Sequence, residues 1–127
     1  MKKLLLILLF LPMIGLGQFT MIPDTNFEQK LIDLGIDFGT INGNVFTGTI
    51  NNVTNLNISG SNIFNLTGIE DFTALAELDC SDNQLTSFDV SNNSALTELD
   101  CSDNQLTSLD VSNNSALAEL DCSDNQL

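Results

Sequence analysis

The stretch LAELDCSDNQLTSFDVSNNSA, residues 75–95, decides the fold, because the chain repeats it almost unchanged. LTELDCSDNQLTSLDVSNNSA follows at residues 96–116, and LAELDCSDNQL occupies residues 117–127. A period of 21 residues as strict as this one is typical of stacked coils, in which each copy buries its apolar face only against its neighbours. Such a chain presents a surface rather than a pocket. The repeat therefore favours binding or scaffolding over catalysis.

Each copy, called a rung below, contains a short alternation of apolar and polar residues. In residues 75–85 the pattern LxxLxCxxNxL is formed by Leu75, Leu78, Cys80, Asn83 and Leu85. The alternation of Leu78 and Cys80 predicts a short strand with one buried face. The second half of the rung repeats the same spacing, so we expect each turn to consist of two half-turns of ten and eleven residues.

This pattern resembles the leucine-rich repeat family, and most closely its nested 21-residue bacterial class, sometimes called Irreko, which is common in secreted proteins of flavobacteria and their relatives. Residues 53–74 carry a 22-residue version, and the phrase LTGIEDFTALAEL at residues 66–78 resembles the internalin-like repeat. The resemblance implies a β-rich solenoid of parallel strands with little helix. It divides residues 53–127 into the units 53–74, 75–95, 96–116 and a partial unit 117–127. Because the sequence stops within a repeat, we expect it to be truncated at the C-terminus.

The first 17 residues have the three-part build of a secretory signal peptide. Lys2 and Lys3 precede an apolar run at residues 4–11, and Gly15 and Gly17 supply small residues at its exit. The run is too short to cross a bilayer, which takes about 20 residues. Cleavage after Gly17 would make Gln18 the new N-terminus, where no cysteine is present for lipidation, and no lipid or transmembrane anchor is expected. The sequence therefore predicts a secreted or cell-surface protein without membrane insertion after cleavage.

Residues 18–52 lack the repeat and are predicted to form an N-terminal cap. Thr25 and Glu28 have the spacing of a capping box, and Phe27 and Leu31 fall on one helical face. We expect a short helix at residues 26–34 that covers the open end of the first rung, since an uncovered end would be prone to association. Residues 45–50 are predicted to form one irregular strand.

Acidic residues dominate the charge of the exported part. All 17 acidic residues follow Gly17, whereas Lys30 is the only basic residue after Gly17. The net charge after cleavage is therefore −16. Nucleic acids and anionic membranes bind through Lys and Arg contacts. The composition therefore argues against both classes of partner and favours cations or basic partners.

Cys80, Cys101 and Cys122 are the first candidates for chemistry, because an exported chain usually pairs its cysteines and three is an odd number. Each one occupies an inward position, so neighbouring cysteines should stack at the strand spacing of about 4.8 Å. Disulfides need β-carbons about 3.8 Å apart, which registered parallel side chains do not reach. We therefore predict a buried column of free thiols that act as small hydrophobic groups.

Asn83, Asn104 and Asn125 form a second column and are predicted to be structural. A strand that turns sharply leaves backbone N–H and C=O groups without partners in the sheet, and an inward amide can satisfy both kinds. The family resemblance implies this role for them. Asn93 and Asn114 form a matching column at the opposite corner.

Outward carboxylates recur in every rung and are the candidates for cation binding. Like charges about 4.8 Å apart repel by about 0.9 kcal/mol even in water, so the face is either solvated or neutralised by bound cations. Calcium takes six to eight oxygens, and neighbouring rungs could supply part of such a shell, although the spacing matches no EF-hand or glycine-rich calcium repeat. The candidate ligands are Asp79, Asp82, Asp100, Asp103, Asp121 and Asp124.

Catalysis is not expected. The chain has no histidine for a catalytic triad and no glycine-rich phosphate loop, and carboxylates on an open ladder lack a desolvated pocket. We predict an exported leucine-rich repeat module, not an enzyme and without a resident cofactor, that mediates protein or glycan binding or adhesion at the cell surface. The alternative is an acidic structural spacer, stabilised or not by calcium, that presents another domain.

Overall fold

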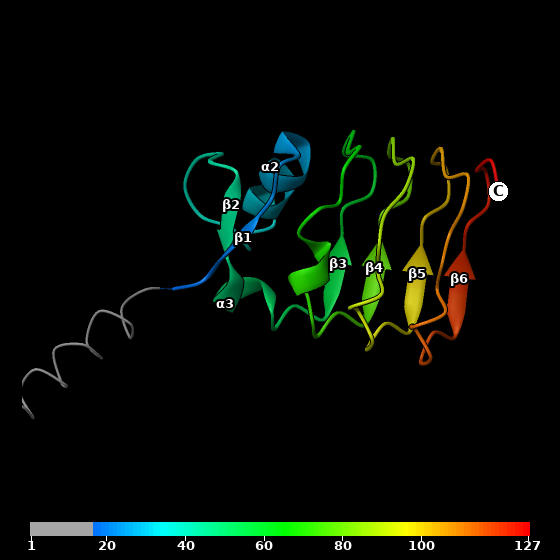
Figure 1. Ribbon diagram of the computed structural model, residues 1–127. Coiled ribbons are helices and arrows are strands. Elements are labelled where there is room, and N and C mark those ends of the chain that lie inside the picture. Colours follow the sequence, from blue (N-terminus) through cyan, green and yellow to red (C-terminus); the bar gives the residue numbers. More distant parts are fainter. Residues whose placement is uncertain (1–16) are drawn as a thin grey trace, which may run out of the picture.

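The computed structural model describes residues 17–127 (Figure 1). The signal peptide predicted at residues 1–17 therefore lies outside the described residues, apart from Gly17. Along the described chain, a small N-terminal cap at residues 18–52 is followed by a regular stack of coils.

Four short strands form one parallel sheet along the stack. They are β3 (Asn55–Asn57), β4 (Glu77–Asp79), β5 (Glu98–Asp100) and β6 (Glu119–Asp121). The register pairs Leu56 with Leu78, Leu78 with Leu99, and Leu99 with Leu120. Each step across the sheet therefore equals one repeat of the sequence, and the predicted parallel strands, one in each rung, are confirmed.

The hydrophobic core is a narrow stripe inside the coils. The middle leucine of each strand points inward, and Leu78 and Leu99 are 2% exposed. The two corners of each rung contribute further leucines to the core. Among them, Leu85, Leu96 and Leu106 are fully buried. Because every rung buries its apolar side chains against the rungs next to it, the stack is stabilised mainly by contacts between neighbours.

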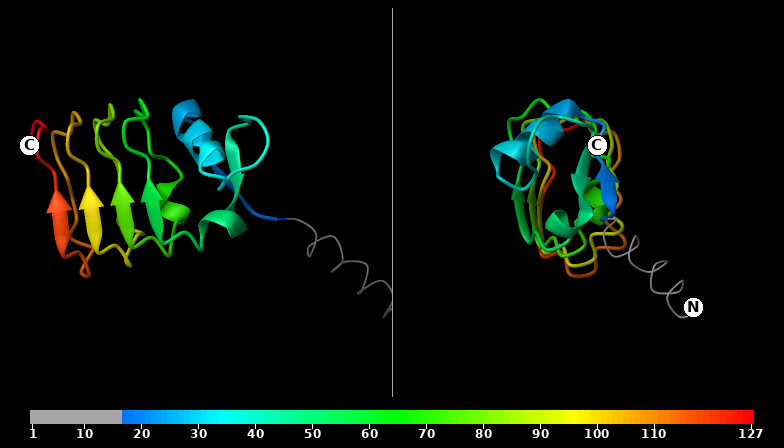
Figure 2. Two further views of the ribbon diagram at one scale, coloured as in Figure 1. Left: turned by 180° about the vertical axis from the view of Figure 1, so that it is seen from behind. Right: turned by 90° about the vertical axis from the view of Figure 1, so that its left-hand side faces the viewer.

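Each coil closes through a return segment that lies opposite the strands, as the view along the stack shows (Figure 2, right). The first rung returns through a short 3₁₀ helix, η1 (Ile69–Asp71). In the later described rungs the return segment has neither helix nor strand. The return side is therefore the irregular side of the molecule, and the first rung differs there from those that follow.

The cap combines a two-stranded antiparallel sheet with two helices. Strand β1 (Phe19–Met21) pairs with β2 (Asn44–Phe46), and α2 (Thr25–Asp33) lies between them in sequence. The strand predicted at residues 45–50 is only partly correct, because Thr47–Ile50 form the helical turn α3. The Thr49 hydroxyl donates to the Phe46 carbonyl at 2.8 Å, and this bond helps the chain turn where the strand ends.

Asp24 caps helix α2, so the predicted capping box at Thr25 is wrong. Its Oδ1 accepts the backbone N–H groups of Asn26 at 2.9 Å and Phe27 at 3.0 Å. Its Oδ2 accepts two more, from Phe64 at 2.9 Å and Asn65 at 3.0 Å. A single carboxylate, 1% exposed, therefore joins the helix to the first rung.

Glu28 does not return to the helix start as a capping box requires. Its two carboxylate oxygens accept the backbone N–H groups of Asn42 at 2.7 Å and Gly43 at 2.8 Å. The side chain is fully buried. Glu28 therefore anchors the loop that leads into β2, while Asp24 anchors the first rung.

Replacement of Asp24 by alanine should destabilise the junction between cap and stack. The change removes a helix cap and leaves four backbone N–H groups without their acceptor, so we expect the free energy of unfolding to fall by at least about 2 kcal/mol. Urea unfolding followed by circular dichroism measures this loss. The control is Asp33→Ala, an exposed carboxylate of the same helix, and equal losses in the two variants would contradict the assignment.

Candidate functional site

The outward side chains of the parallel sheet form one continuous surface, called the sheet face below. The four strands stand side by side in the view from behind (Figure 2, left). Over them lies an open hollow of about 460 Å³. The sheet face consists of Asn55, Asn57, Glu77, Asp79, Glu98, Asp100, Glu119 and Asp121.

The first rung starts the sheet face with amides in place of carboxylates. The Asn57 side-chain amide donates to Asp79 Oδ2 at 3.0 Å, and the amide of Asn55 donates to Glu77. Each amide thus provides a hydrogen-bond donor to the first carboxylate of its column. From β4 onward the columns are purely acidic, so the negative charge of the face grows away from the cap.

The aspartates that end the strands also shape the turn that follows. Asp100 Oδ1 accepts the backbone N–H of Ser102 at 3.0 Å and its hydroxyl at 2.6 Å. The same arrangement recurs in the neighbouring rungs. In the last rung the Ser123 hydroxyl, with a smaller contribution from its backbone N–H, holds the pKa of Asp121 below its usual value. These carboxylates are therefore both surface charges and turn-forming groups.

Asp82, Asp103 and Asp124 are placed by the backbone. All three lie in the left-handed region, with φ of 51°, 51° and 50°, where aspartate is tolerated better than most residues. Gly60, with φ of 59°, is the equivalent residue of the first rung. Their recurrence is therefore explained by the turn alone. Within residues 17–127, no group of three or more His, Cys, Asp or Glu side chains lies close enough to hold a metal ion, and calcium binding by the six aspartates stays a prediction.

The asparagine column lies inside the corner that follows each strand. The Asn104 amide donates to the carbonyls of Cys101 at 3.1 Å and Ser102 at 3.0 Å in its own rung, and of Cys80 at 3.0 Å in the rung before. Its oxygen accepts the N–H of Leu85 at 3.0 Å. Asn83 and Asn125 make equivalent bonds. Each side chain therefore joins two successive rungs.

Asn93 and Asn114 lie at the other corner and also join two rungs. The Asn114 amide donates to the carbonyls of Val90 at 2.9 Å and Asn93 at 3.0 Å. The Asn93 amide makes the corresponding bonds to Ile69 and Phe72. The side-chain oxygens of both residues are buried without a hydrogen-bond partner, so this column acts through its donors only.

The cysteines lie in one inward column as free thiols. Cys80 and Cys101 are fully buried, and Cys122 is half-buried. Burial raises the pKa of Cys80 well above its ordinary value and that of Cys101 to about 12. Burial therefore favours the protonated form of both thiols and disfavours the thiolate, which is the nucleophilic and metal-binding form.

The return side carries two further hollows that sequence reasoning missed. One, of about 520 Å³, lies between the first and second rungs, and the other, of about 410 Å³, lies between the second and third. Phe88 and Asp89 line both. The only indication of these hollows in the sequence was one substitution: Phe88 stands where the next rung has a leucine, Leu109.

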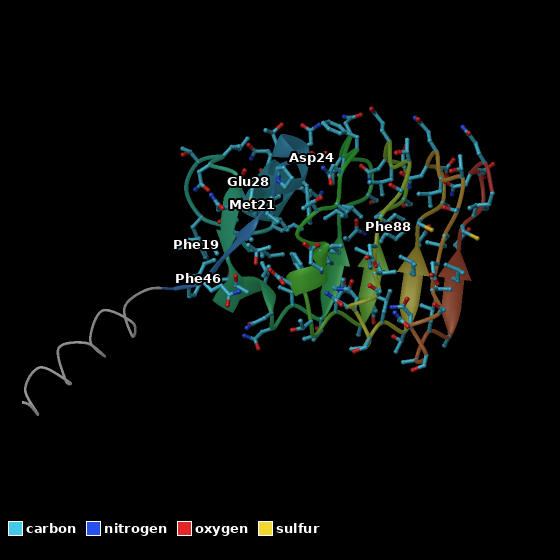
Figure 3. The ribbon with its side chains drawn as sticks, in the orientation of Figure 1. Phe19, Met21, Asp24, Glu28, Phe46 and Phe88 are labelled. Atoms are coloured by element: carbon cyan, nitrogen blue, oxygen red, sulfur yellow. The ribbon has the colours of Figure 1, made fainter. Side chains whose placement is uncertain are left out.

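The far end of the cap has a different chemistry from the sheet face. Phe19 and Met21 on the outer face of β1 are 64% and 68% exposed. The ring of Phe46 contacts that of Phe19 edge to face, with centroids 5.9 Å apart (Figure 3). This end is therefore apolar where the stack is acidic. Among residues 17–127, no helix has the length and apolar character needed to span a bilayer.

Two solved structures similar to this chain are internalins, leucine-rich repeat proteins of Listeria monocytogenes. The functional domain of InlJ from Listeria monocytogenes, which includes a cysteine ladder, is 33% identical with a TM-score of 0.76, over 86% of this chain and 25% of that one. The internalin InlF from the same species is 25% identical with a TM-score of 0.73, over 83% of this chain and 31% of that one. This chain thus spans about a quarter to a third of the length of these neighbours.

A third structure, of the CBM51-2 and INT domains of Clostridium perfringens ZmpB in complex with GlcNAc, is 22% identical over 69% of this chain and 21% of that one, with a TM-score of 0.55. This last likeness is one of fold. No protein-family model and no curated protein matches the sequence. The parallel sheet, the scarcity of helix and the two internalin neighbours together identify a leucine-rich repeat fold of the bacterial internalin-like kind.

Replacement of Asn104 by alanine should loosen the joint between the second and third rungs. The change leaves buried carbonyl groups of both rungs unpaired, so we expect a loss of about 1 to 3 kcal/mol in the free energy of unfolding. Chemical denaturation measures it. The matched control is Gln105→Ala, because this neighbouring side chain is exposed, and a loss in the control as large as in Asn104→Ala would contradict the role.

Stability should fall at alkaline pH because of the buried thiols. In the unfolded chain the thiols ionise near pH 9, whereas folded Cys101 has a pKa of about 12. Between these values the unfolded state binds fewer protons than the folded state, so the free energy of unfolding decreases as pH rises. Denaturation between pH 8 and 11 tests this, and Cys101→Ala should show a shallower decline. An unchanged decline in Cys101→Ala would be evidence against the buried thiol as its cause.

Proposed function

We propose that this chain is an exported leucine-rich repeat module that binds a protein or glycan partner at the cell surface and has no catalytic activity of its own. The observation that carries the proposal is the sheet face, which presents side chains from four registered strands on one open surface. A hollow of this shape offers contact area and hydrogen-bonding groups. It lacks the enclosed pocket that catalysis by shifted carboxylates requires.

The charge of the sheet face favours a basic partner. Glu98 and Glu119 are exposed and project from neighbouring strands, and residues 53–127 contain no Lys or Arg to neutralise them. Complementary charge steers a basic partner toward such a surface and speeds its association. The internalin likeness supports the use of this fold as a binding module, and the preference for a basic partner rests on the charge of the sheet face alone.

An acidic spacer is the second candidate, and one specific observation favours it. The strand triplet Glu-Leu-Asp is identical in β4, β5 and β6, and the chain has no Trp or Tyr, which dominate binding hot spots. A surface that reads one partner with high specificity would vary from rung to rung. On this reading the stack holds a neighbouring domain away from the cell.

The test is to screen the exported chain against arrays of cell-surface proteins and glycans, with the double variant Glu98→Gln and Glu119→Gln beside it. We expect a partner whose binding the double variant weakens at least about tenfold, with an unchanged melting temperature. The control is Asp33→Asn, on the exposed side of α2. Absence of any partner for the wild type would reject the binding module in favour of the spacer.

A further inference from the structure

We propose that the return side of the stack carries a neutral-saccharide subsite centred on Phe88. This inference rests on the proposed function and assigns its glycan-binding part to a surface distinct from the sheet face. Phe88 is labelled over the middle of the stack in Figure 3. The subsite comprises the two return-side hollows that Phe88 and Asp89 share.

The aromatic ring of Phe88 departs from a repeat that is otherwise almost unchanged. The units 75–95 and 96–116 differ at only two positions, Ala76 against Thr97 and Phe88 against Leu109. Leucine is compatible with the position of Phe88, because Leu109, the equivalent residue of the next rung, packs against the hydrophobic core. The phenyl ring is therefore not required by the fold, and being half-buried it lines both hollows with an aromatic surface.

Polar groups that are available to hydrogen-bond a ligand line the two hollows beside the ring. Asn92 lines the first hollow and Asn113 the second, both are exposed, and within residues 17–127 neither side chain makes a hydrogen bond. Asp89 uses only Oδ1, which accepts the N–H of Ser91 at 2.8 Å. In Asn65 the oxygen is occupied by Thr67, which leaves the amide donors available. The hollows therefore offer both donors and acceptors.

This combination matches the chemistry of a pyranose. One face of the sugar ring is a set of C–H groups that packs on an aromatic surface, and its paired hydroxyls both donate and accept, as side-chain amides and carboxylates do. Glu70, Asp89 and Asp110 are the charged residues among the lining, and no basic residue is present. The site therefore disfavours anionic sugars. The two volumes fall within the range of small-molecule sites.

The repeat also suits a chain of sugars rather than one ring. Asn92 and Asn113 are equivalent residues of successive rungs, and next to them the Asn114 amide donates to the Asn93 carbonyl at 3.0 Å, so the two rungs are in direct contact at this corner. The rungs repeat at about 4.8 Å where their strands pair, which is near the length of one pyranose residue. A linear oligosaccharide would lie along the stack and contact both hollows.

The experiment is a calorimetric titration of the exported chain with neutral tetrasaccharides, namely cellotetraose, chitotetraose and mannotetraose. We expect at least one to bind, and Phe88→Leu to weaken its binding about tenfold through loss of the aromatic surface. This variant introduces the residue of the next rung, so the fold is retained, which the melting temperature verifies. Leu109→Phe should strengthen binding, because it adds a second ring one rung further along.

The sheet-face variant separates this inference from the proposed function. Glu98→Gln with Glu119→Gln should leave saccharide binding unchanged. If that variant abolishes binding while Phe88→Leu has no effect, the glycan lies on the sheet face, so the Phe88 subsite is refuted and the binding module stands. If no tetrasaccharide binds but an array protein does, the subsite is again refuted alone. If the array screen also finds no partner, both proposals fail.

Discussion

The structure depends on the inward asparagine that follows each strand. Strands of three residues pair few backbone groups, so the corners would leave carbonyls buried without donors. Asn104 supplies those donors to its own rung and to the rung before it, and Asn83 and Asn125 act in the same way. Burial of leucines provides most of the free energy, but the amides set the register in which those leucines meet.

The regular part of this fold could be predicted from the sequence, because its partners are the same residues one period away. The strand positions and the inward direction of Leu78 followed from the spacing, and the parallel pairing of the strands was implied by the leucine-rich repeat resemblance. The N-cap could not, because Asp24 is selected by Phe64 and Asn65, forty residues distant. The left-handed backbone conformation of Asp103 could not be predicted from the sequence either. The return-side hollows depend on which side chains of different rungs meet there.

The acidic residues illustrate how one side chain can serve the turn and the surface together. Asp79 and Asp100 close the turn after their strands through the serines, while Asp82 and Asp103 adopt the left-handed corner. Much of the negative charge therefore follows from the geometry of the coil. Features that the coil does not require, such as the amides of Asn55 and Asn57 or the ring of Phe88, are better indicators of what the surface binds.

The near-identity of successive rungs affects how the number of repeats can change. Units 75–95 and 96–116 differ at two positions, and each contacts only its neighbours, so either could sit beside the other without repacking. Unequal recombination between such similar coding segments would insert or delete whole turns and still produce a foldable chain. The length of the stack can therefore change in steps of one coil without disturbing the bonds of Asp24 that hold the cap to the first rung.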